Sequence, residues 1–145
     1  MQDQPTYAEL LAAVQHFLET DVVPALEGTK KFHARVAANV LAIVRREVDA
    51  EDAQLRAEWS RLDQLLSGSE TLPGDRIELR RRLRERTGAL CERIRSGEAD
   101  AGPWRRTVLQ HVRQTVVEKL AVANPKYLGS EAGESAASAR RGNQY

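Results

Sequence analysis

The stretch KKFHARVAANVLAIVRREVD, residues 30–49, predicts the fold class of this chain. Its large apolar residues recur every three or four positions, which is the spacing of one face of an α-helix, and its alanines allow neighbouring helices to approach closely. The apolar positions are Phe32, Val36, Val40, Ile43, Val44 and Val48. Because this face is broader than a surface helix requires, the stretch predicts the central helix of an all-α bundle.

The flanking sequence predicts about four more helices, joined by short loops. The first begins at Thr6, whose spacing from Glu9 forms a capping box. It is expected to end before Pro24, whose ring would clash with the preceding turn of a helix. The others are predicted over residues 51–66, 75–96 and 103–123.

The C-terminal end has a different character. From residue 129 the sequence GSEAGESAASARRGNQY has little apolar surface to bury, so ordering it would cost entropy without compensation. We therefore expect one domain, a compact all-α bundle of about five helices over residues 5–128. A disordered polar tail is expected over residues 129–145.

The composition restricts the class of protein. In 145 residues, Lys+Arg 22 and Asp+Glu 21 give a formal charge of +1, so no strong overall field attracts nucleic acid or an anionic membrane. No run approaches the ~20 apolar residues of a membrane-spanning helix. Cys91 has no partner for an internal disulfide bond, and the first residues do not resemble a secretory signal. These features predict a cytoplasmic protein with no membrane partner.

Helix 75–96 carries the one concentration of arginines that could attract phosphates. Glu78, Glu85 and Glu92 are interleaved with those arginines, and Glu78–Arg82 and Arg81–Glu85 have the i, i+4 spacing of ion pairs. The pattern favours a solvated, salt-bridged helix over a nucleic-acid interface.

No motif for catalysis or for metal binding is present. His16, His33 and His111 fall on three different predicted helices, without HExxH spacing or a cysteine cluster. No nucleophile elbow and no glycine-rich phosphate loop occurs either. The sequence assigns no catalytic residue, no metal site and no cofactor.

Polar residues border the apolar face of helix 30–49. His33 projects into the apolar sector, and Arg35 and Asn39 lie at its edge. One interpretation is structural, with Asn39 tying one helix to another by hydrogen bonds. The other is a polar pocket for a small anionic ligand or a partner's side chain, in which Arg35 supplies a planar fork.

A second polar strip lies on helix 103–123. Thr107, His111 and Thr115 are spaced four apart and so share one helix face. A general base needs an orienting partner, and no carboxylate lies four residues from His111. The strip therefore does not assign a catalytic role to His111.

Five segments carry a resemblance to a known family. They are PALEG at residues 24–28, FHARVAANVL at 32–41, RE at 46–47, IRSG at 94–97 and NPKYL at 124–128. Through these segments and their order along the sequence, the chain resembles an uncharacterised bacterial family of helical domains of unknown function. The resemblance implies that its members are often encoded beside proteins similar to aminoglycoside phosphotransferases and beside acyl-CoA dehydrogenases. The resemblance thus implies an accessory subunit and transfers no catalytic residue.

Three hypotheses of function follow. The leading one is an interaction module that binds a phosphotransferase-like or acyl-CoA-related enzyme through an apolar groove, with self-association left open. The second is a small enzyme or ligand-binding domain at the same polar edge, and nucleic-acid binding through helix 75–96 comes last. The candidate binding residues are His33, Arg35, Asn39, His111, Lys126 and Tyr127.

Overall fold

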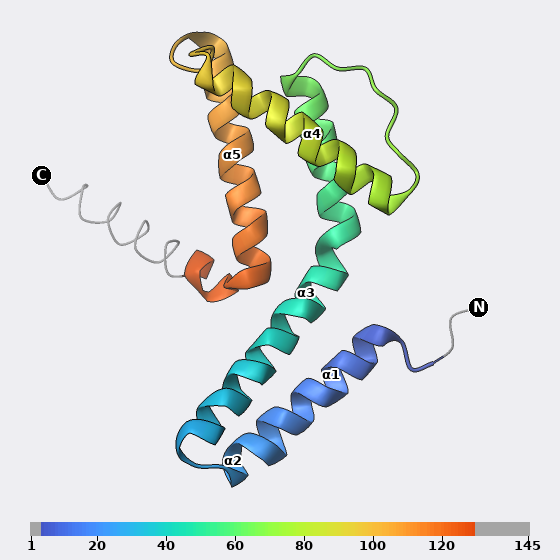
Figure 1. Cartoon of the computed structure of the whole chain (residues 1–145), viewed down its shortest axis with the longest axis vertical. Coiled ribbons are helices and arrows are strands. Elements are labelled where there is room, and N and C mark those ends of the chain that lie inside the picture. The colour runs from blue at the N-terminus through green and yellow to red at the C-terminus, as the bar shows by residue number, and fades with distance from the viewer. Residues whose placement is uncertain (1–3, 130–145) are drawn as a thin grey trace, which may run out of the picture. The chain divides into compact units, whose positions relative to one another are not determined.

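The computed structural model describes residues 4–129, and within them it contains helices and no strand, which confirms the all-α prediction (Figure 1). The predicted tail lies outside the described residues from residue 130 onward. The elements in chain order are α1 (Tyr7–Phe17), the π-helical turn η1 (Leu18–Val22), α2 (Val23–Ala25), α3 (Gly28–Leu65), α4 (Arg76–Arg95) and α5 (Gly102–Ala123).

Two predicted helix starts are present as side-chain caps. At α1 the Thr6 hydroxyl accepts a hydrogen bond from the Glu9 N–H at 3.3 Å, and the Glu9 carboxylate accepts one from the Thr6 N–H at 2.7 Å. At α4 the Asp75 carboxylate accepts a hydrogen bond from the Glu78 N–H at 2.8 Å. Each cap satisfies N–H groups that have no partner within the helix itself.

The predicted end of the first helix before Pro24 is wrong. The chain stays helical from α1 through η1 to α2, which ends at Ala25. The Val23 N–H donates to the carbonyl of Leu18, five residues back, so the α-helical ladder is already interrupted where Pro24 has no N–H to donate. The chain then reverses, with Leu26 extended and Gly28 at φ 54, and α3 begins.

The predicted boundary between helices 30–49 and 51–66 is also wrong, because α3 runs through it without a break. No glycine or proline occurs between Gly28 and Gly68, and alanine and glutamate around residue 50 are good helix formers. Asp49 and Asp52 suit an N-cap, but the chain does not use them to end one helix and begin another.

The chain forms two compact units that divide within α3, after Glu51. The first unit contains α1, η1, α2 and the N-terminal part of α3, which returns beside the first helix after the reversal (Figure 1). The second unit begins at Asp52 and contains the rest of α3, α4 and α5. Within residues 4–129, no helix has both the length and the apolar character needed to cross a bilayer.

The hydrophobic core lies in the second unit, not around residues 30–49 as the sequence predicts. Three of its helices contribute, and its buried members are Trp59, Leu62, Leu65, Leu79, Leu83, Leu90 and Val108. The Trp104 indole N–H donates to the carbonyl of Leu65 at 3.1 Å, which satisfies one of the free carbonyls at the end of α3. The core thus fastens the C-terminal part of α3 to α4 and α5.

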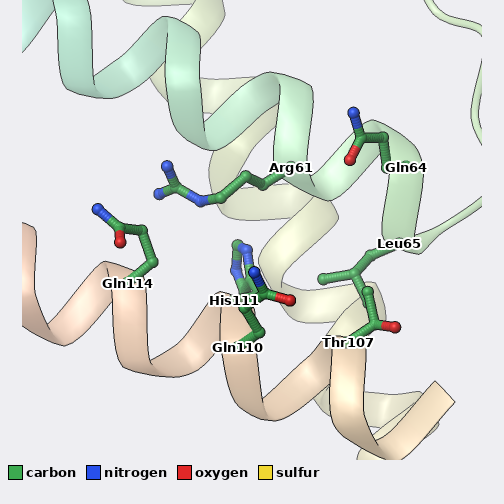
Figure 2. A pocket seen from close by; sticks show the side chains of 7 residues that line it. All are labelled: Arg61, Gln64, Leu65, Thr107, Gln110, His111 and Gln114. Carbon is green, nitrogen blue, oxygen red and sulfur yellow. The ribbon is translucent and has the colours of Figure 1, made fainter. Parts of the chain in front are cut away.

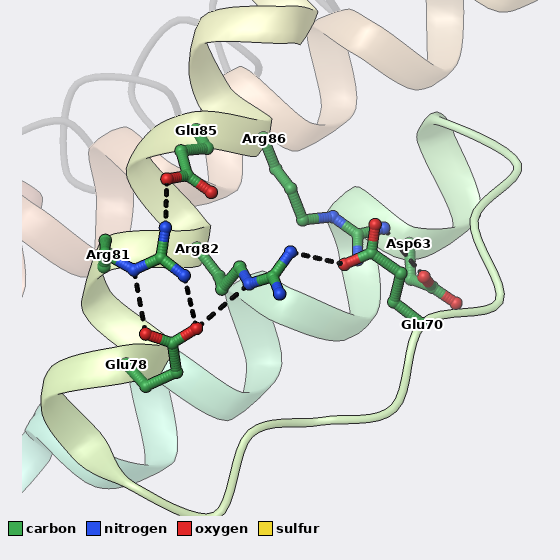
Figure 3. A network of polar contacts seen from close by, with 7 residues as sticks. All are labelled: Asp63, Glu70, Glu78, Arg81, Arg82, Glu85 and Arg86. Atoms are coloured by element: carbon green, nitrogen blue, oxygen red, sulfur yellow. Dashed lines mark hydrogen bonds and ion pairs between the residues drawn. The ribbon is translucent and has the colours of Figure 1, made fainter.

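Arg86 is a buried cation at the edge of this core (Figure 3). It donates to the Asp63 carboxylate at 2.7 Å, and its guanidinium lies over the Trp59 ring at 4.4 Å from the ring centroid. A Cβ built on Gly68 would lie 2.6 Å from Arg86 and 2.6 Å from Asp63. A larger residue at position 68 would therefore force the ends of the Arg86 and Asp63 side chains to shift.

Candidate functional site

The first unit exposes a row of large apolar side chains on α3. We call Phe32, Val36, Val40 and Val44 the α3 apolar face; each is between 40% and 62% exposed. Their i, i+4 spacing places them in one row along three turns of the helix. A second exposed row, Tyr7, Leu10, Val14 and Phe17, runs along α1. Only Ala38 and Ala42 are fully buried among the described residues of this unit.

A shallow groove lies beside the α3 apolar face and contains two of the predicted residues. Arg35 and Asn39 line it from α3 together with Ala38 and Ala42, and Glu19 and Val23 line it from η1 and α2. Its volume is about 280 Å³. The structure therefore brings Arg35 and Asn39 together at one edge. Asn39 is exposed, and the hydrogen bond expected to tie it to another helix is not formed within residues 4–129.

The other predicted residues do not join this groove. His33 is exposed, with its ring 5.8 Å from that of Phe32. Lys126 and Tyr127 are exposed residues that follow α5. His111 belongs to a separate pocket, formed within the second unit.

The pocket of the second unit lies between α3 and α5 and has a volume of about 340 Å³. Its lining is rich in amides: Arg61, Gln64 and Leu65 from α3, and Thr107, Gln110, His111 and Gln114 from α5. In Figure 2 the His111 ring rises from α5 toward α3, the Leu65 side chain extends from α3 into the space between the helices, and the Arg61 side chain runs along α3 toward the side of Gln114. We call this cavity the α3–α5 pocket.

An ion pair neutralises the only formal charge in the lining of the α3–α5 pocket. Arg61 donates to both oxygens of the Glu118 carboxylate, at 2.8 Å and 2.6 Å, in the planar two-bond geometry that suits a guanidinium. The Gln114 amide N–H₂ donates to the same carboxylate at 3.1 Å, so its amide orientation is fixed. The carbonyl oxygen of Gln114 is thereby left as an acceptor.

His111 is the buried polar group of the pocket, at 6% exposure. Burial and, to a smaller extent, the Arg61 cation lower the pKa of His111 below its ordinary value, whereas Glu118 acts in the opposite direction. The ring is therefore neutral at pH 7. Two lining residues contain a buried polar atom that has no hydrogen-bond partner within the described residues, His111 at Nδ1 and Arg61 at Nε. The same is true of Thr115 Oγ1, on α5 outside the lining.

The ion pairs predicted on α4 are present (Figure 3). Glu78 pairs with Arg82 at 3.1 Å, and Arg81 bonds to both Glu78 and Glu85. Hydrogen bonds from Arg81 first, and then from Arg82, lower the pKa of the Glu78 carboxyl to about 2. These carboxylates occupy guanidinium groups that a phosphate would otherwise engage. Within residues 4–129, no group of three or more His, Cys, Asp or Glu side chains could hold a metal ion.

Sequence reasoning found His111 and Thr107 but not the amides around them. Gln110, Gln114 and Glu118 continue the same strip at i, i+4 spacing, so a longer count along α5 could have found that half of the pocket. Arg61 and Gln64 carry no local signal. They lie beside α5 only because the core packs α3 against α4 and α5, and the periodicity of the α3 sequence does not predict that packing.

Comparison with family models gives a match to a domain of unknown function (DUF6285) over residues 24–127. Comparison with curated proteins gave no match, and comparison with solved structures gave none either. The matched segment begins in α2, so it contains the α3 apolar face and the α3–α5 pocket but not α1. Because the match covers most of its length, the chain belongs to the DUF6285 family of domains of unknown function.

Proposed function

We propose that this domain is a helical protein-interaction module whose docking surface is the α3 apolar face and the adjoining groove. The observation that carries the proposal is the exposure of Phe32, Val36, Val40 and Val44 in one row. Twelve residues of helix extend over about 18 Å, enough to receive three turns of another helix. Contiguous apolar patches on a protein surface mark interaction sites, because leaving them in water costs free energy.

The occupant that fits this surface is an amphipathic helix with an acidic edge. A row at i, i+4 spacing offers a ridge that packs into the groove of a second helix. Arg35 precedes Val36 and so lies about 100° around the helix from it, at the border of the row. No ion pair of Arg35 is formed within the described part of the chain. An aspartate or glutamate of the partner helix would supply a charge-assisted hydrogen bond there.

The partner protein is proposed from the resemblance that the sequence carries. It implies an accessory subunit, with a phosphotransferase-like or an acyl-CoA-related enzyme as the partner. The segment that defines the family contains the α3 apolar face and not the exposed row on α1. A role shared by the family would therefore use α3.

The Arg35–Asn39 groove is better suited to the rim of an interface than to a ligand site. Its volume of about 280 Å³ is below the usual range of small-molecule sites, roughly 300–1,000 Å³. Half of its residues are alanine or valine, which cannot hold a polar ligand by hydrogen bonds. We therefore assign Arg35 and Asn39 to the border of the docking surface.

The test is a pair of matched double variants. Val36→Asp with Val40→Asp alters the α3 apolar face, where these residues are 45% and 49% exposed. Val112→Asp with Val116→Asp makes the same change on α5, where the residues have the same spacing and are 44% and 49% exposed. Each variant is used for affinity capture from the source cells, and also with purified phosphotransferase-like and acyl-CoA dehydrogenase-like proteins. Cross-linking with mass spectrometry then locates the contact.

We expect the α3 double variant to lose the partner and the α5 double variant to retain it. Arg35→Glu should weaken the association, and the cross-linked segment of the partner should be an amphipathic helix with acidic residues. Equal loss with both double variants would show non-specific apolar capture. Concentration-dependent dimers that the α3 variant abolishes would instead identify a second copy of this chain as the occupant, and would overturn the proposed partner.

A further inference from the structure

The α3–α5 pocket contains buried polar atoms that form no hydrogen bond within the described residues. His111 is almost completely buried, and neither of its ring nitrogens has a hydrogen-bond partner within residues 4–129. Arg61 Nε, in the same lining, is also buried and unpartnered within the described residues. Leaving a buried polar group unpaired costs roughly 1–3 kcal/mol, so proteins usually satisfy such groups with a side chain, water or a ligand.

The charge of the pocket favours an uncharged ligand over an anion. The two terminal nitrogens of Arg61 are occupied by Glu118, so the pair contributes no net charge. Desolvation lowers the pKa of His111, which keeps the ring neutral at pH 7. An anion in the pocket would thus meet no unpaired cation to offset the loss of its hydration.

The polar groups of the lining instead offer donors and acceptors in pairs. The Gln114 amide donates to Glu118 and so presents its carbonyl as an acceptor. Gln64 and Gln110 each supply both a donor and an acceptor, and Thr107 adds a hydroxyl. The Leu65 side chain adds an apolar surface. Such a lining complements a group that itself carries an N–H and a carbonyl side by side.

We propose that the α3–α5 pocket, lined by Gln110, His111 and Gln114, binds a small uncharged molecule that presents a carboxamide or an equivalent paired donor and acceptor. The volume of about 340 Å³ lies at the lower end of the usual range of small-molecule sites, roughly 300–1,000 Å³, which fits a small ligand. This site lies within the second unit and is independent of the α3 apolar face.

The experiment uses matched pairs of probes on the full-length chain. Nicotinamide and benzamide are the uncharged carboxamides, and nicotinate and benzoate are the carboxylates of the same shape. Heteronuclear NMR follows the side-chain amides of Gln64, Gln110 and Gln114 and the ring of His111 during titration. Water-filled pockets give no saturable shift with any probe.

The expected result is a saturable shift of these resonances with the carboxamides and none with the carboxylates. Gln114→Met removes the acceptor from an exposed position that tolerates substitution, and should weaken binding about five- to tenfold, the usual value of one neutral hydrogen bond. Gln54→Met is the matched control. Its amide also bonds to Glu118, at 3.4 Å to the backbone carbonyl, but Gln54 is outside the pocket, so binding should be unchanged.

Two results would overturn the proposal. Preferential binding of the carboxylates would identify an anion site and show that the Arg61–Glu118 pair opens to receive it. Absence of a saturable shift with every probe at millimolar concentration would show a pocket that holds water only. Because the α3 apolar face is distant in sequence from Gln114 and belongs to the other unit, neither result bears on the proposed interaction surface.

Discussion

At the scale of single residues, the packing of the second unit depends on the small size of Gly68. Gly68 leaves the space in which the Arg86 guanidinium meets Asp63. Arg86 is also held against the Trp59 ring, so it cannot withdraw without losing that contact. A buried cation that loses its carboxylate is strongly destabilising.

We predict that Gly68→Ala lowers the free energy of unfolding by roughly 1–3 kcal/mol, the usual cost of overpacking. The new Cβ would displace the Arg86–Asp63 pair, which it approaches to 2.6 Å. Gly88→Ala is the control, because a Cβ there meets nothing within 4 Å and Gly88 lies within α4. It should stabilise by up to about 1 kcal/mol through helix propensity. Urea denaturation that gives both variants the same sign would refute this account.

Glu58 provides a prediction that depends on pH. Burial raises the pKa of its carboxyl, although Arg61 and Lys119 act against the shift. A folded-state pKa above the unfolded value gives stability that is fully present below about pH 4.5 and is lost as pH rises through the folded pKa. Charged Glu58 is thus unfavourable at neutral pH. Glu58→Gln should raise the melting temperature by a few degrees at pH 7 and leave it unchanged at pH 4. A lower melting temperature at pH 7 would mean that the attraction of Glu58 to Arg61 and Lys119 outweighs the cost of its burial.

At the scale of helices, the sequence predicts starts better than ends. Thr6 and Asp75 announce helix starts, because a capping side chain must be close in sequence to the N–H that it satisfies. The continuity of α3 past Asp49 carries no such local mark, since aspartate occurs both at caps and within helices. In the same way the spacing of polar residues along α5 predicts its polar strip, whereas the contribution of Arg61 to the pocket depends on tertiary packing.

For α4 we predict that little DNA or RNA is retained at physiological salt. Arg81 and Arg82 pair with Glu78, and Arg86 pairs with Asp63, so phosphate binding to these three arginines would require their ion pairs to be broken. Fluorescence anisotropy with labelled duplex and single strands measures the affinity. A micromolar Kd that weakens steeply with added salt would instead show that the arginines release counterions on binding, and would favour a nucleic-acid role.

At the scale of the whole molecule, the two units differ in how much apolar surface they bury. The second unit has a core drawn from three helices, with Leu62 and Leu79 fully buried. The first unit buries only Ala38 and Ala42 among its described residues, and each of its larger apolar side chains is half-buried or exposed. Since alanine contributes little apolar area, the hydrophobic stabilisation of the first unit is small. The same exposure that makes it a docking surface makes it the less stable unit.

We therefore predict that a fragment of residues 52–145 folds alone and that a fragment of residues 1–51 does not. The fragment of residues 52–145 keeps the core, the Arg86–Asp63 pair and the α3–α5 pocket, because all three lie in the second unit. It should unfold cooperatively on heating, followed by circular dichroism at 222 nm, a standard wavelength for helix content. The fragment of residues 1–51 should show little helix and a gradual thermal transition, because short isolated helices without a packed core are marginally stable in water. A cooperative transition in residues 1–51 at low concentration would mean that the first unit is stable without a partner. If that transition appeared only at high concentration, the α3 apolar face would be burying itself against a second copy of the fragment.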